Sequence, residues 1–418
     1  MSRILILGAG TAGTIMANRL RRRFAKDVAA GKTSITVVDE DPRHIYQPGL
    51  LFVPFGVYRP DDIVRPRRMQ LHEDVTYKPG AIEMVIPEDH AVLLKDGTRL
   101  PYDVLVVATG TRIAPEETEG MMGPEWHHAV FDFYTVEGAT ALARKLSTWR
   151  GGKLVVNVVE MPIKCPVAPL EFSFLADWYF TMRHMRDTVD ITYATPLDGA
   201  FTRPIAAQHI GDLLDRKHIG LVTEFNAGRV DNERKVLVSW DGRELPFDVL
   251  VTIPLHQGAA YLKATPSLVD DNLFVRTNPA TLQSTAFPDI FAIGDATNLP
   301  TSKAGSVAHF ESEVLDDNIG HFLAGEPLED GFDGHANCFV ETGFDQALLL
   351  DFNYDTEPLP GRYPLPIGPM TLLGESRMNH MGKMAFKWVY WNLLLPGHTI
   401  PGIPARMSMR GKLAPATT

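Results

Sequence analysis

The sequence predicts an α/β fold that contains two Rossmann-like dinucleotide-binding domains, the second nested in the first. Three observations predict it: a strand–helix–strand unit at the N-terminus, a segment that repeats 145 residues later, and a buried strand that follows the repeat at 290–293. Strands that alternate with helices indicate a parallel sheet with right-handed crossovers. The first domain is expected to comprise 1–114 and 276–325, the second domain 115–275, and the C-terminal region 326–418.

The first domain opens with a continuous apolar run at 3–7, which predicts a strand covered on both faces. A helix is expected from Thr14 to about Ala30, and a second strand at 34–38. Strands and turns are expected over 77–102, followed by a buried strand that ends in a turn at 104–110.

The second domain repeats this pattern. Residues 94–106 align with 239–251, and both segments contain an Asp-Gly turn followed by Leu-Pro, an aromatic residue and Asp-Val-Leu-Val. A period of 145 residues is too long for a solenoid, so two related domains are the simplest account. Further strands of the second domain are expected at 154–159, 189–193 and 249–254.

Composition limits the function classes. The chain has 51 acidic and 40 basic residues, a net charge of −11 that argues against nucleic acid as a partner. Two cysteines in 418 residues are too few for a secreted disulfide scaffold, and no secretory signal or membrane-spanning run is visible. We therefore expect a soluble or peripheral protein without a metal site; a homo-oligomer is left open.

A glycine-rich loop follows the first strand. Gly8, Gly10 and Gly13 form a G-x-G-x-x-G pattern, with Ala12 inside it, and Asp39 ends the next strand. In this context the first glycine permits a tight turn, the second lets the backbone approach a pyrophosphate, and the third lets the helix pack on the strand. Asp39 is expected to accept a hydrogen bond from a ribose hydroxyl, with Glu40 as the neighbouring alternative.

The second domain lacks such a loop. After its first strand the chain reads Glu160-Met161-Pro162-Ile163-Lys164-Cys165-Pro166, which contains no glycine. Prolines have no backbone N–H to offer a phosphate. We therefore do not expect NAD(P)H to bind here, and a thiol stands where the nucleotide loop would be.

The chain resembles the flavoproteins with two dinucleotide-binding domains. The resemblance rests on the glycine loop together with Ala108-Thr109-Gly110 and Gly294-Asp295. It implies FAD as the cofactor, with Asp295 at the ribityl chain. It also implies that Lys303 and Gly305 lie near the flavin, and that Gln47 and Pro48 belong to a segment that passes over the flavin ring.

More specifically, the chain from Arg3 to about Leu395 resembles sulfide:quinone oxidoreductases and the flavoprotein subunit of flavocytochrome c sulfide dehydrogenase. The residues that carry this resemblance are Cys165, Glu171 and Cys338. It implies that the two cysteines face the flavin as a redox pair, that Glu171 handles protons of the incoming sulfide, and that quinone accepts the electrons. Many members have a third cysteine near 120–135; this chain has none there, and His128 in that segment is the second candidate acid–base residue.

The C-terminal region is expected to lie at a membrane interface. Between Ser376 and Thr418 there are six Lys or Arg residues and no acid. Apolar residues recur at helical spacing: Met378, Met381, Met384, Trp388, Trp391 and Leu395. With Lys383 and Lys387 off this stripe, the pattern predicts an interfacial amphipathic helix on anionic lipid. We expect a peripheral protein of the inner or cytoplasmic membrane surface, with Phe339 and Lys303 as quinone contacts.

Three other functions share features of this pattern. A type II NADH:quinone oxidoreductase has the same architecture but requires the second glycine loop. A sulfide dehydrogenase flavoprotein passes electrons to a cytochrome, and the lipid-like tail argues against it. A flavin-binding redox sensor or sulfur carrier would use the cysteine pair without turnover.

Overall fold

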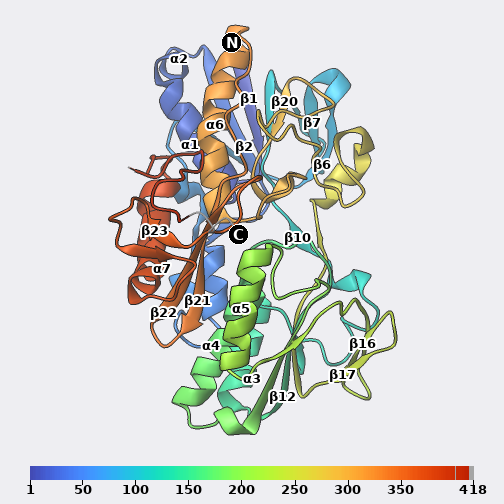
Figure 1. Ribbon diagram of the computed structural model, residues 1–418. Helices are drawn as coiled ribbons and strands as arrows, with labels where there is room; N and C mark the ends of the chain where they lie inside the picture. The colour runs from blue at the N-terminus through green and yellow to red at the C-terminus, as the bar shows by residue number, and fades with distance from the viewer. Residues whose placement is uncertain (401, 414–418) are drawn as a thin grey trace.

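The computed structural model describes residues 1–400 and 402–413. Its first sheet has the order β20-β9-β1-β2-β5, and all four pairs are parallel. The strands are β1 (Ser2–Leu7), β2 (Thr33–Asp39), β5 (Thr76–Pro79), β9 (Val104–Val107) and β20 (Ile290–Ala292). Helices α1 (Thr11–Arg23) and α6 (Gly305–Ala324) pack against each other beside this sheet, in the upper lobe of Figure 1.

The second sheet, in the lower lobe, has the order β11-β18-β12-β13-β14 and is also parallel. Its strands are β11 (Val130–Phe131), β12 (Gly152–Val158), β13 (Val189–Ala194), β14 (Gly220–Val222) and β18 (Val249–Ile253). The helices of this lobe are α3 (Val136–Thr148), α4 (Ala168–Met182) and α5 (Pro204–Arg216). Because β20 and α6 return to the first lobe after β18, the second Rossmann-like unit is nested in the first, as the sequence predicted.

The internal repeat forms the same small sheet in each lobe. Strands β6 (Ile82–Ile86), β7 (Ala91–Leu94) and β8 (Arg99–Pro101) pair antiparallel in the first lobe. Strands β15 (Ala227–Asp231), β16 (Val236–Ser239) and β17 (Glu244–Pro246) do so in the second. Two short strands lie in the segments that connect the lobes, β10 (Arg112–Ile113) and β19 (His256–Gln257), and they pair antiparallel with each other.

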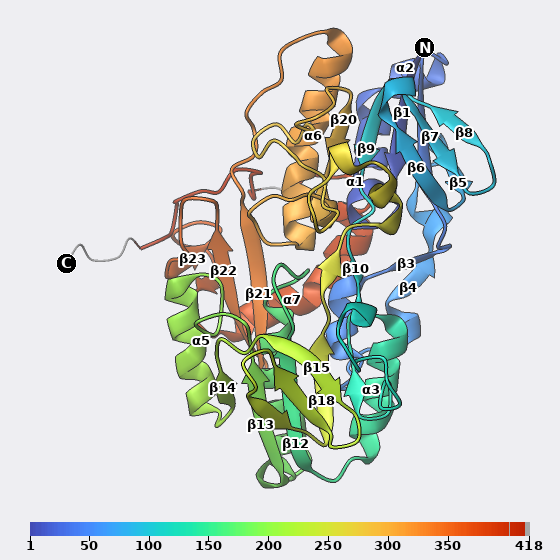
Figure 2. The ribbon, with the colours of Figure 1, turned by 90° about the vertical axis from the view of Figure 1, so that its right-hand side faces the viewer.

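The C-terminal region lies at the waist of the molecule, alongside both lobes (Figure 2). A hairpin of β21 (Ala336–Gly343) and β22 (Gln346–Phe352) contacts α4, and the smaller pair β23 (Gly361–Tyr363) and β24 (Met370–Leu372) follows. Helix α7 (Arg377–Val389) packs on this hairpin and ends in a π-helical turn, Tyr390–Leu394.

One detail differs from the predicted elements. The helix expected from Thr14 to Ala30 is divided at Phe24 into α1 and the short α2 (Ala25–Ala29). No described helix combines the length and hydropathy needed to span a bilayer.

Candidate active site

A cavity of about 540 Å³ lies where the carboxyl ends of the first sheet, the β12–α4 connection and the C-terminal region meet. Ligands of α/β proteins bind at this end of the strands. The sequence-predicted residues that line the cavity are Gly8, Gly10, Ala12, Asp39, Gln47, Pro48, Ala108, Thr109, Gly110, Cys165, Glu171, Gly294, Asp295, Lys303, Gly305, Cys338 and Phe339.

The glycine loop has the geometry that a phosphate-binding turn requires. Gly8 has φ +92°, and a Cβ there would lie 2.5 Å from the carbonyl oxygen of Ala108. A Cβ on Gly13 would lie 1.9 Å from the carbonyl oxygen of Gly8, so Gly13 sets the packing of helix on strand without lining the cavity. A Cβ on Gly10 would meet nothing within 4 Å, so the loop backbone faces open space there.

Two helix N-termini border the cavity without a side-chain cap. Gly10 precedes α1 and Ala304 precedes α6, and neither supplies a side-chain hydrogen bond to the first turn. The free N–H groups and helix dipole at each end favour an anion. Gly305 in the first turn of α6 also faces open space. Two such ends and the glycine loop on one cavity fit an extended, phosphate-containing cofactor of the flavin type.

Asp39, the last residue of β2, makes more contacts than the sequence suggested. Asp39 Oδ2 accepts from the Ala9 N–H at 2.7 Å and pairs with the buried Arg67 guanidinium. Arg67 also lines the cavity, and no motif in the sequence indicated it. Glu40, the predicted alternative, is exposed and does not line the cavity, so the structure places only Asp39 at this position.

Asp295 lies in a tight turn whose backbone is hydrogen-bonded to a buried carboxyl group. Glu311 of α6 accepts from the Gly294 N–H at 2.5 Å, and burial raises the pKa of Glu311 to about 8. Burial also raises the pKa of Asp295, while Lys303 and Lys164 oppose that shift. The turn is therefore held in place by a buried carboxyl group that keeps its proton at neutral pH.

Cys165 is presented to the cavity by the segment that replaces a second glycine loop. Its N–H donates to the carbonyl oxygen of Lys303 at 2.6 Å, and its own carbonyl accepts from the Ala168 N–H at 2.9 Å, where α4 begins. The residue has φ +50°, a strained conformation for a side chain with a Cβ. The Tyr134 hydroxyl donates to the same carbonyl at 3.2 Å. The lobes are thus joined by backbone hydrogen bonding next to the thiol.

Cys338 reaches the same cavity from β21, and both cysteines are free thiols. Burial raises the pKa of Cys165, and the charges of Lys383 and Lys164 oppose that shift. Burial raises the pKa of Cys338 strongly, and the charges of Cys165 and Asp351 add to it. The charge of Cys165 therefore acts on the pKa of Cys338, and lysine charges oppose the rise in pKa at Cys165.

Glu171 forms a buried ion pair that sequence reasoning missed. Its Oε1 accepts from Lys383 Nζ and from the Glu341 N–H at 2.6 Å. The Glu171 side chain is 2% exposed and that of Lys383 10%. Burial lowers the pKa of Lys383 to about 7, and the charge of Cys165 opposes this. Lys383 therefore points into the cavity, which corrects the expectation that it faces lipid headgroups.

Lys303 also differs from its expected role. It lines the cavity, but its ammonium donates to the carbonyl oxygens of Asp295 at 3.0 Å and Thr297 at 2.6 Å. It also lies 3.9 Å from the centre of the Phe274 ring. These contacts hold the Gly294–Asp295 turn, so the side chain has no free donor directed at a quinone.

The structure does not bring His128 to the site. It is exposed on a turn before β11 and is absent from the cavity wall. Its neighbour His127, which stacks on Trp126, lies 3.7 Å from Asp132. His128 is therefore not placed to act on a group in this cavity.

The predicted apolar stripe of the C-terminal helix is divided between surface and core. Met378 and Met381 are exposed, as is Trp388 at 62%. Trp391 and Leu395 are buried, and the Trp391 ring lies 4.2 Å from the Arg65 guanidinium. The helix changes to π geometry at Tyr390, so the two halves of the stripe do not share one face.

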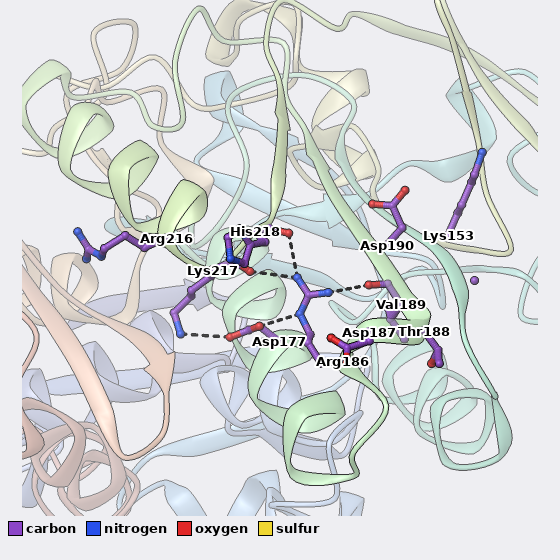
Figure 3. Close-up of a pocket in the computed structure, with 11 residues that line it drawn as sticks. Lys153, Asp177, Arg186, Asp187, Thr188, Val189, Asp190, Arg216, Lys217 and His218 are labelled. Carbon is purple, nitrogen blue, oxygen red and sulfur yellow. Dashed lines mark hydrogen bonds and ion pairs between the residues drawn. The ribbon is translucent and has the colours of Figure 1, made fainter.

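A second, open cavity of about 710 Å³ lies at the amino ends of β12 and β13 (Figure 3). Arg186 is directed into it but donates to Asp177 and to the carbonyl oxygens of Val189, Lys217 and His218. Lys217 also donates to Asp177 at 3.3 Å. Because the polar groups of this cluster hydrogen-bond to one another, we assign the cluster a structural role.

Comparisons with known proteins find similar chains. The model of the pyridine nucleotide-disulphide oxidoreductase family matches residues 2–157. The mitochondrial sulfide:quinone oxidoreductase of Mus musculus is 24% identical over 94% of this chain and 86% of its own length. That of Schizosaccharomyces pombe is 25% identical over 93% and 89%. These matches confirm the predicted resemblance to sulfide:quinone oxidoreductases and indicate a flavin-type cofactor.

Solved structures show the same fold. The crystal structure of the sulfide:quinone oxidoreductase of Aquifex aeolicus superimposes with a TM-score of 0.76, at 18% identity, over 94% of this chain and 92% of that one. A NAD-dependent persulfide reductase of A. fulgidus superimposes with a TM-score of 0.63 over 88% of this chain and 69% of that one. The nested arrangement of two Rossmann-like units is therefore shared.

Proposed function

We propose that this protein is an FAD-dependent sulfide:quinone oxidoreductase, which oxidises sulfide to zero-valent sulfur and passes the electrons to a membrane quinone. One observation carries the proposal. Cys165 and Cys338, which are 173 residues apart in the sequence, line one cavity together with the glycine loop and two uncapped helix N-termini. That arrangement occurs in a chain similar to proteins of this name over nearly its whole length.

The residues present fit FAD. The loop Gly8–Gly13 and the N-terminus of α1 would hold the pyrophosphate, and Asp39 the adenosine ribose. The Gly294–Asp295 turn would hold the ribityl chain, and the N-terminus of α6 the negative edge of the ring. When bound, FAD supplies a two-electron acceptor for the cysteine sulfurs and a donor for the quinone.

The cysteines carry the sulfur chemistry. With Cys165 and Cys338 joined by a sulfur bridge, HS⁻ attacks the Cys165 sulfur, forms a persulfide there, and releases Cys338 as a thiolate. The new S–S bond replaces the one that breaks, so this exchange is electron-neutral. Lys383 and Lys164 favour negative charge near Cys165. The Glu171–Lys383 pair is the group that can take the sulfide proton, because it lines the cavity and is buried.

The segment around Cys165 argues against NADH as the donor. Pro162 and Pro166 flank it, and the backbone N–H of Cys165 is already bonded to Lys303. No free run of N–H groups remains there for a second pyrophosphate. We expect the flavin to stay oxidised when NADH is mixed with the protein anaerobically.

The quinone and the membrane are assigned to the C-terminal region. Its contribution to the cavity wall is mainly apolar: Phe339, Met370, Phe386, Val389, Ile400 and Ile403. Large exposed apolar residues of the C-terminal region include Leu365, Ile367, Met378, Met381 and Trp388. An apolar surface next to an apolar cavity suits an acceptor that is dissolved in a bilayer.

The test is sulfide-dependent reduction of decylubiquinone by the flavin-loaded protein and by C165S and C338S. We expect turnover in the wild type and at least a 100-fold loss in each variant, with flavin content unchanged. Cytochrome c in place of quinone separates the cytochrome-linked alternative. Full turnover in both variants would refute the cysteine mechanism, and no turnover in the wild type would refute the function.

A further inference from the structure

The proposed reaction requires a proton from water. HS⁻ loses two electrons and one proton when its sulfur is oxidised, and a quinone takes up two electrons and two protons. One proton per turnover must therefore enter a cavity whose acid–base pair, Glu171 and Lys383, is buried. The structure contains a line of titratable groups between that pair and the surface.

This line begins at Glu341, next to the pair. Its N–H donates to Glu171 at 2.6 Å, and its side-chain Oε1 lies 2.9 Å from His380 Nδ1. His380 Nε2 in turn lies 3.8 Å from Asp345 Oδ1. Exposure rises along the line: the side chains of Glu341, His380 and Asp345 are 2%, 24% and 70% exposed. The imidazole therefore has one nitrogen on a buried carboxyl group and the other directed to water.

The line also connects to the cavity. His380 and Lys383 are three residues apart on α7, so their side chains are neighbours on the face that packs against β21. The second oxygen of Glu341, Oε2, is buried and has no hydrogen-bond partner among the described residues. Because the Glu341 N–H and Lys383 Nζ donate to the same oxygen, Glu171 Oε1, Glu341 is a neighbour of the ammonium, and we assign its free Oε2 to proton exchange with Lys383 through water.

Glu341 and Lys383 have similar pKa values. Burial raises the pKa of Glu341 to about 7, against the opposing effect of His380. Burial lowers the pKa of Lys383 to about 7. Other charged groups on the surrounding elements are Glu171 on α4, Lys217, which lies over the Phe344 ring, and the exposed ion pair of Arg216 with Glu375. Groups of similar pKa exchange protons with little driving force lost.

We propose that Glu341 and His380 form a proton relay that connects water at Asp345 with the Lys383–Glu171 pair, and that it supplies the proton needed for quinone reduction. The proposal rests on the function proposed above. Neither residue touches the cavity, so both act through Lys383. A buried His–Glu pair that only supported the hairpin would leave proton-dependent rates unchanged.

The test isolates the quinone half of the reaction. The flavin is reduced by titration with dithionite to its end point, so that sulfide chemistry does not enter, and is then mixed anaerobically with decylubiquinone between pH 6 and pH 9. We expect H380A and E341Q to be reoxidised at least tenfold more slowly than the wild type above pH 7, with a larger solvent isotope effect. Added imidazole should restore the rate of H380A.

The control is H398A, which removes an exposed histidine of the same region. It should behave like the wild type. Reoxidation of H380A and E341Q at wild-type rates across the pH range would overturn the relay, as would a slow H380A that imidazole fails to restore. Failure of sulfide to reduce the wild-type flavin would refute the proposed function. The quinone assay does not use sulfide, so it would still test the relay.

Discussion

Replacing Lys383 by methionine tests the buried ion pair beside the cysteines. The variant leaves Glu171 as a buried carboxylate whose remaining hydrogen bond is the Glu341 N–H at 2.6 Å. Removal of one partner of a buried pair costs about 3 kcal/mol. E171Q leaves the ammonium with two neutral acceptors, the glutamine amide oxygen and the Phe339 carbonyl oxygen at 3.3 Å, and no countercharge, and we expect a similar loss of about 3 kcal/mol.

The double variant K383M/E171Q distinguishes pairing from simple packing. Since both charges are then gone, we expect its loss to stay at or below about 3 kcal/mol, whereas independent effects would sum to about 6 kcal/mol. Urea unfolding of the flavin-loaded protein at pH 7 measures these energies. As a control, R99Q breaks the exposed Arg99–Asp89 pair, 53% exposed on each side, and should cost less than about 0.5 kcal/mol. A double variant whose loss equals the sum would refute the pairing.

Three further predictions concern other regions of the structure. G13A places a Cβ 1.9 Å from the carbonyl oxygen of Gly8 and should abolish flavin retention. The control G211A, where a Cβ meets nothing within 4 Å, should retain the flavin, and absorbance at 450 nm after gel filtration measures both. Burial raises the pKa of Glu311 from 4.5 to about 8, so the folded state binds an extra proton between these values and loses stability as pH rises. E311Q should therefore reduce the stability difference between pH 5 and pH 8, measured by urea unfolding, by about 3.5 kcal/mol, and an unchanged difference would contradict this. W388E should lower partitioning onto anionic liposomes at least tenfold, whereas W240E, on the second lobe, should not; equal partitioning would argue against α7 as the membrane contact.

The architecture could be predicted from short sequence patterns because the contacts that require those residues lie within short segments of the chain. Gly8 is fixed by contacts with Ala108 and Thr109, and Gly13 by a contact with Gly8. The repeated segments 94–106 and 239–251 each supply the last strand of a three-stranded sheet. The missing glycine loop could be predicted because glycine-free, proline-containing sequence cannot form one. Cys165 was therefore identified from the sequence alone.

Contacts between distant segments could not be predicted in the same way. The helical period predicts which side chains share a face of the helix, but not which element that face contacts. The sequence therefore predicts that Lys383 contacts lipid, whereas in the structure it contacts β21 and Glu171. The π-helical turn at Tyr390 rotates Trp391 into the core, and no residue pattern marked it. His128 was considered for its place in the sequence, yet the fold holds it on the surface.

An anaerobic titration of the bound flavin tests the central claim most directly. Sulfide is added to wild-type protein while flavin absorbance is followed, and decylubiquinone is then added. We predict full bleaching by sulfide, full recovery on quinone, and no bleaching in C165S or C338S. A flavin that stays oxidised with sulfide but bleaches with NADH would contradict the account, because the segment around Cys165 would then serve a nucleotide rather than sulfur.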